Sequence, residues 1–77
     1  MKELLRKIPK VDELLRSPGL AEAVKLYGDY AVTEAVRAEL DALRQGILQQ
    51  QITAMPELPV LCRQICRRVW RASQPSF

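Results

Sequence analysis

Histidine is missing from this chain, and glycine and aromatic side chains are scarce. Three glycines and four aromatic residues occur among 77 residues, with no histidine. The chain therefore lacks the commonest general base and an ordinary set of zinc ligands, and its scattered glycines do not form a phosphate-binding loop. The serines have no evident partner to activate them. We expect no catalytic, metal or cofactor site within these residues.

Cysteine is also rare, and long apolar runs are absent. Cys62 and Cys66 are four residues apart, a spacing that puts them on one face of a helix and is not a C-x-x-C redox motif. We expect both to be reduced, buried and apolar in character. No run of about 18 apolar residues could span a membrane, and the first residues lack the apolar core of a secretory signal. The sequence predicts a cytoplasmic protein without membrane contact.

A helical pattern divided by glycine and proline fills the chain. Hydrophobic residues make up 48% of it and charged residues 27%, which fits one small globular domain. Apolar residues recur at helical spacing, and no segment alternates as a strand does. The sequence predicts an all-α fold: a small bundle of about four helices at residues 11–16, 18–27, 30–50 and 59–71, the third the longest. Residues 2–7 form a short amphipathic start, and residues 49–59 a linker.

Four residues carry signals for helix ends. Ser17 and Asp29 directly precede two of the predicted helices, and their side chains are suited to capping helix N-termini. Gly28 adopts positive φ at little cost and should end the helix at 18–27. Gly46 marks a point of fraying in the longest helix. The sequence thus predicts caps at Ser17 and Asp29 and a stop at Gly28.

The remaining side chains divide between surface and core. Glu39 is assigned to the solvent-facing side of the longest helix, and Arg37 lies four residues before Asp41, so a weak exposed ion pair is expected there. Trp70 stands beside the apolar stripe of the last helix. We expect it to pack into the core, with stacking on a nucleic-acid base as the alternative.

Charge is distributed unevenly along the chain. Residues 1–16 carry a net charge of +2 (five basic, three acidic), residues 17–57 carry −3 (three basic, six acidic), and residues 58–77 hold four arginines and no acid. Arginine suits phosphate because its planar guanidinium donates two parallel hydrogen bonds. If the termini lie together, the two basic ends form one surface. The candidate anion-binding residues are Arg6, Lys7, Lys10, Arg63, Arg67, Arg68 and Arg71.

Two kinds of partner fit this charge pattern, RNA and an acidic protein. A helical protein-interaction module could use the arginine face on an acidic partner. DNA binding through a helix-turn-helix is disfavoured, because the long helix is acidic on its exposed face and would be repelled by phosphate.

Several motifs resemble the N-terminal domain of bacterial selenocysteine synthase, the L-seryl-tRNA(Sec) selenium transferase family. They are LRKIP at 5–9, VDELL at 11–15, YG at 27–28 and VRAELDALR at 36–44, in this order and spacing. A leucine-proline pair followed by a cysteine-bearing helix, at 58–62, is similar more loosely. The resemblance is close over about 44 of the 77 residues.

The resemblance implies a function and a domain plan. Residues 1–71 would be a tRNA-binding helical domain that recognises the D-arm of selenocysteine tRNA. Residues 72–77 would begin a linker to a pyridoxal-phosphate core, absent here, that converts seryl-tRNA(Sec) to selenocysteinyl-tRNA(Sec). This chain would then be non-catalytic and hold no cofactor. The parent enzyme would be a homodecamer assembled through its core, and the isolated domain a monomer.

Overall fold

The computed structural model describes residues 2–74, which form five helices and no strand. They are α1 (Lys2–Lys7), α2 (Val11–Arg16), α3 (Pro18–Tyr27), α4 (Asp29–Leu48) and α5 (Leu58–Ser73). The predicted all-α class is confirmed. The longest helix is the one expected at 30–50, and it is fourth in order because residues 2–7 form a helix of their own. Within the described part, no helix is both long and apolar enough to cross a membrane.

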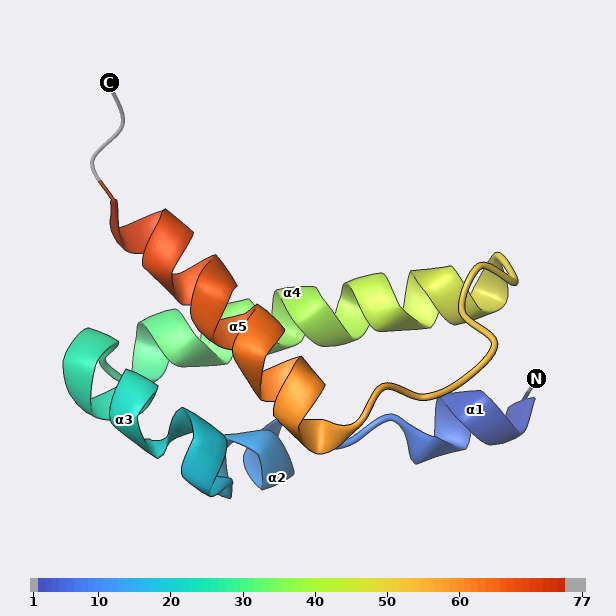
Figure 1. Cartoon of the computed structure of the whole chain (residues 1–77), viewed down its shortest axis with the longest axis horizontal. Coiled ribbons are helices and arrows are strands. Elements are labelled where there is room, and N and C mark those ends of the chain that lie inside the picture. The colour runs from blue at the N-terminus through green and yellow to red at the C-terminus, as the bar shows by residue number, and fades with distance from the viewer. Residues whose placement is uncertain (1, 75–77) are drawn as a thin grey trace.

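Helix α4 is the centre of the fold. Helices α2, α3 and α5 pack against it, α3 and α5 also pack against each other, and α1 contacts α4 (Figure 1). In Figure 1, α1 lies near the C-terminal end of α4, whereas the C-terminal end of α5 projects at the opposite side of the molecule. The C-terminal end of α5 therefore does not lie beside α1, as it would if the two ends of the chain lay together, and Arg71 is separated from the N-terminal basic residues.

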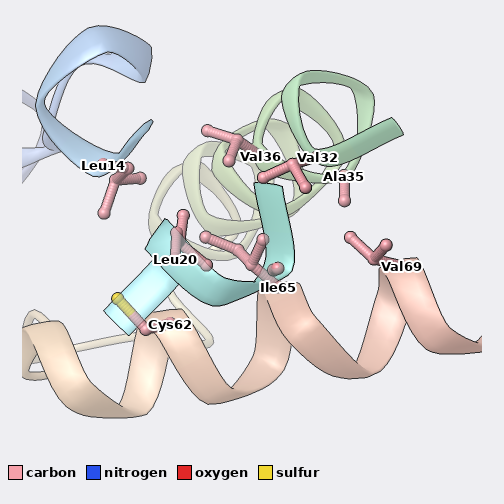
Figure 2. Packing of buried hydrophobic residues seen from close by; sticks show 9 residues of the cluster. Leu14, Leu20, Val32, Ala35, Val36, Cys62, Ile65 and Val69 are labelled. Carbon is pink, nitrogen blue, oxygen red and sulfur yellow. The ribbon is translucent and has the colours of Figure 1, made fainter. Parts of the chain in front are cut away.

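Two apolar clusters hold the helices together. The larger joins α2, α3, α4 and α5, and Figure 2 shows its side chains converging between the helices. The smaller fixes α1 and the linker to the C-terminal half of α4 and the first turns of α5. Each fully buried aliphatic side chain contributes roughly 1.5–3 kcal/mol. Those with the least exposure are Leu14, Leu20, Val32, Val36, Ile47, Leu61, Ile65 and Val69.

The linker between α4 and α5 is anchored at Gly46. The backbone N–H groups of Gln51 and Ile52 donate to the Gly46 carbonyl oxygen at 2.9 and 3.1 Å. Gly46 is buried, and a Cβ at this position would collide with the Ile52 side chain. The expected fraying is therefore wrong: glycine is present because the returning chain needs the space. Helix α4 ends at Leu48, two residues earlier than predicted.

The two predicted side-chain caps do not form. Ser17 occupies the N-cap position of α3, but its Oγ donates to the Leu14 carbonyl oxygen at 2.7 Å and so satisfies the end of α2 instead. Asp29 is the first residue of α4, and the cap position belongs to Gly28, which has no side chain. Gly28 has φ 91° and ends α3 as predicted.

Replacing Gly28 by alanine is expected to lower the free energy of unfolding by about 1–3 kcal/mol, because φ 91° with ψ 158° is a region open essentially to glycine alone. No atom lies within 4 Å of the added Cβ, so the cost is conformational and not steric. Urea denaturation followed by circular dichroism measures it. The reciprocal control is Gln50→Gly at φ 62°, which should leave stability unchanged or raise it. An alanine variant as stable as the parent would contradict this explanation.

Candidate nucleic-acid interface

Three arginines form a row along the outer face of α5. Arg63, Arg67 and Arg71 are four residues apart and exposed, while Leu61 and Ile65 of the same helix are buried on the opposite face. Eight residues of helix span about 12 Å. Within the described residues, none of the three arginines forms an ion pair. This arginine row (Arg63, Arg67 and Arg71) therefore presents uncompensated guanidinium groups to solvent.

Arg68 does not belong to that row. Its Nε donates to Oε1 of Glu39 at 2.6 Å, and Glu39 is only 8% exposed on α4. The sequence predicts that Glu39 lies on the surface and that Arg68 is one of the anion-binding side chains. The first prediction is wrong, because Glu39 is nearly buried, and Arg68 has a bonded carboxylate partner. Glu39 lies three residues after Val36 and four before Leu43, both buried. That spacing was the available sign that Glu39 faces inward.

Replacing Arg68 by methionine should lower the free energy of unfolding by roughly 1–3 kcal/mol, because the nearly buried Glu39 carboxylate loses its charged donor. The Arg68 side chain is 43% exposed, so the lower half of this range applies. The matched control is Arg71→Met, which removes the same charge from the same helix without breaking a pair and should change stability by less than about 0.5 kcal/mol. Equal losses in both variants would show that the pair contributes nothing.

The ion pair predicted for Arg37 forms with a different partner. Arg37 lies 3.8 Å from Glu34 and not next to Asp41, and both members of the pair are more than half exposed. Such a pair contributes little to stability.

The N-terminal basic residues make a separate patch. Arg6 and Lys7 are exposed in the last turn of α1, and Lys10 is exposed just before α2. Helix α1 packs near the start of α5, through Leu61, so this patch is remote from Arg71 at the other end of α5 (Figure 1). An anion that contacts both the N-terminal patch and Arg71 must therefore span most of the length of α5.

The two cysteines are free, as expected, but only Cys62 is buried, so the predicted burial of Cys66 is wrong. Cys62 is buried, with its Sγ 3.5 Å from Oγ of Ser17, whereas Cys66 is half-buried beside the Gly19 carbonyl oxygen. Burial, and secondarily the charge of a neighbouring Cys62 thiolate, raises the pKa of the Cys66 thiol. Cys66 is thus protonated at neutral pH and a poor nucleophile. In the described residues, no three His, Cys, Asp or Glu side chains cluster as a metal site would require.

Trp70 is not a core residue. Its exposed fraction is 54%, and it stands at a hollow of about 440 Å³ between α3 and α5. The expectation of core packing is therefore wrong; the indole ring is accessible, as the alternative of stacking on a nucleic-acid base would require. We call this the α3–α5 hollow; its lining residues are Gly19, Glu22, Ala23, Leu26, Tyr27, Arg63, Cys66, Arg67 and Trp70.

Comparison with known proteins shows the family to which this helical domain belongs. Residues 5–44 match the family model described as "Selenocysteine synthase N terminal". The chain belongs to this family. The matched segment runs from α1 to most of α4, so it includes Arg6, Lys7 and Lys10 of the N-terminal patch, while the arginine row on α5 lies beyond it.

Curated relatives of this selenocysteine synthase N-terminal domain carry the name L-seryl-tRNA(Sec) selenium transferase. The protein from Carboxydothermus hydrogenoformans is 45% identical over 51 residues, which are 66% of this chain and 11% of the relative. The protein from Actinobacillus pleuropneumoniae is 33% identical over 51 residues, which are 66% of this chain and 11% of the relative. The protein from Hyphomonas neptunium is 32% identical over 57 residues, which are 74% of this chain and 12% of the relative. The chain thus spans about a tenth of these relatives' length, and no solved structure matches it.

Proposed function

We propose that this chain serves selenocysteine synthesis as a tRNA-recognition domain that binds the D-arm of selenocysteine tRNA. The conversion of seryl-tRNA(Sec) to selenocysteinyl-tRNA(Sec) would belong to a pyridoxal-phosphate core carried by the longer parent enzyme. Two findings support this proposal: membership of the selenocysteine synthase N-terminal family, and relatives named as selenium transferases that act on L-seryl-tRNA(Sec). In this division of labour the helical domain selects the tRNA and the core performs the chemistry.

The arginine row is the observation that supports RNA binding most directly. A structured RNA offers phosphates and 2′-hydroxyls along its backbone, and a protein reads them with basic and polar side chains on a rigid frame. Arg63, Arg67 and Arg71 supply three such side chains at regular spacing on one helix. The buried face of α5 packs against α3 and α4, which holds the row in place. No catalytic group is needed for this role.

The competing occupant of the row is an acidic protein. Exposed apolar side chains in the first turn of α5, Leu58 and Val60, would suit a protein partner. A titration with poly-glutamate separates the two readings, since a row shaped for phosphate should bind RNA far more tightly than carboxylate at the same ionic strength. Tight poly-glutamate binding with weak RNA binding would favour the protein-interaction module.

Recognition is tested by comparing selenocysteine tRNA with serine tRNA as ligands of the purified chain at about 0.15 M salt. The proposal requires selenocysteine tRNA to bind at least about tenfold more tightly, because both tRNAs share a phosphate backbone and differ in the D-arm. Transplanting the D-arm of selenocysteine tRNA into serine tRNA should transfer the affinity. Equal binding of the two tRNAs would contradict specific recognition and would show only a general affinity for RNA.

A further inference from the structure

We infer that the α3–α5 hollow receives a single unpaired nucleotide, with its base stacked on Trp70 and its phosphate held by Arg63 and Arg67. The inference rests on the proposed RNA-binding function and specifies the kind of RNA element bound. It assigns a role to an exposed tryptophan that neither the fold nor the arginine row requires.

The apolar wall of the hollow is unusual for a surface. Trp70 is 54% exposed and Leu26 is 76% exposed, and the half-buried Tyr27, which also lines the hollow, packs against the larger apolar cluster. Ile65 and Val69 occupy the buried face of α5. Trp70 therefore lies on the flank of the helix, where it lines the hollow together with residues of α3. Large apolar side chains that gather at an exposed hollow are typical of a binding site.

The basic and acidic side chains of the hollow come from different helices. Arg63 and Arg67, two members of the arginine row, line the α5 wall, and Glu22 lines the α3 wall. Within the described residues, Glu22 forms no ion pair with either arginine. A phosphate is attracted to the α5 wall, while the Glu22 carboxylate can accept a hydrogen bond from an exocyclic amino group of a base. The walls thus match the two ends of one nucleotide.

The size and charge of the hollow favour a nucleotide over other occupants. A volume of about 440 Å³ is in the range of small-ligand pockets. Bases within a duplex are stacked and cannot present a face to an indole ring, whereas bases in a loop can be splayed out onto aromatic side chains. A second copy of this chain docked through the same face would bring another arginine row toward Arg63 and Arg67, and like charges would repel. The element bound is therefore a loop and not a regular stem.

Trp70 is the single tryptophan of the chain, so its fluorescence reports directly on this hollow. Two RNA probes are compared: a hairpin with the stem and loop of the D-arm, and the same stem as a blunt duplex. Stacking should quench the fluorescence with the hairpin and leave it nearly unchanged with the duplex. Equal quenching by both probes, or a change that depends on protein concentration without RNA, would overturn the inference.

Variants give a second, independent readout. Trp70→Leu should weaken hairpin binding by roughly 5- to 150-fold, and Trp70→Phe should restore most of it, because stacking needs an aromatic face. Tyr30→Leu is the matched control, since Tyr30 is 80% exposed but does not line this hollow; we expect less than about a twofold change. Circular dichroism verifies that each variant keeps its helices.

The outcomes separate this inference from the proposed function. If Trp70→Leu binds the hairpin as tightly as the parent while selenocysteine tRNA is still preferred, the stacking site is wrong and the recognition role stands. If neither probe nor tRNA binds, both are wrong. If Trp70→Leu loses the hairpin and Trp70→Phe regains it, the hollow is a nucleotide site.

Discussion

Replacing the arginine row by glutamine (Arg63, Arg67 and Arg71 together) should weaken binding of selenocysteine tRNA by about 100- to 1000-fold. Each of these side chains is exposed, without an ion pair in the described structure, and free to donate to phosphate. A solvent-exposed hydrogen bond contributes a net of roughly 1–1.4 kcal/mol, and three of them, about 3–4 kcal/mol in all, account for the expected loss. The plot of log K against log salt should also become shallower by about 2–3, since each lost phosphate contact removes about 0.7–0.9. Binding isotherms at several salt concentrations measure both effects.

The matched control removes the same charge from elsewhere on the surface. Arg16, Arg37 and Arg44 are exposed on α2 and α4, and replacing all three by glutamine also lowers the net charge by three. If RNA binds at α5, this control variant should lose less than about a tenth as much affinity as the row variant. Equal losses would mean that the chain attracts RNA through its total charge, without a defined surface.

Truncating Ile65 to alanine should lower the free energy of unfolding by about 2–5 kcal/mol. Ile65 is 0% exposed and belongs to the cluster in which α2, α3, α4 and α5 meet (Figure 2). A chain of 77 residues has a total stability of roughly 4–12 kcal/mol. The substitution thus removes a large fraction of it, and detaches the helix that carries the arginine row. Urea unfolding followed by far-ultraviolet circular dichroism gives the value.

Two further substitutions calibrate that loss. Ile65→Val removes one methylene group and should cost about 0.5–1.5 kcal/mol. Val60→Ala, on the same helix but 40% exposed, should change stability by less than about 0.5 kcal/mol. A small loss at Ile65 comparable to that at Val60 would show that α5 is held only loosely in the core.

The helices were predictable because their signals are local. Gly28, the prolines and the helical spacing of apolar residues gave the positions of α2 to α5 to within a few residues. The clearest missed boundary, the early end of α4, depends on a contact that no local rule contains: Ile52 returns over Gly46 after a turn of the chain. Local preference likewise assigns the Ser17 side chain to the start of α3, but its hydroxyl donates to the Leu14 carbonyl oxygen at the end of the preceding helix.

The site was predictable in part, for a similar reason. The periodicity of α5 was enough to predict that Arg63, Arg67 and Arg71 share a face. Whether an arginine is free depends on the neighbouring helix, and Arg68 is bonded because Glu39 of α4 lies beside it, 29 residues away in sequence. Trp70 was misplaced because the flank of α5 on which it lies faces a hollow and not packed side chains. That distinction requires the distance between α3 and α5, which only the fold supplies.

The most direct test of an RNA surface on α5 is an NMR titration of the isotope-labelled chain with the D-arm hairpin of selenocysteine tRNA. Amide shifts should concentrate on residues 60–71 of α5, with side-chain shifts at the Trp70 indole and the Arg63 and Arg67 guanidinium groups. The N-terminal patch should respond less, because α1 packs near the first turns of α5, away from Trp70 and Arg71 at the other end of that helix. Shifts confined to α4, or shifts that appear only on dilution of the protein, would contradict RNA recognition through this helix.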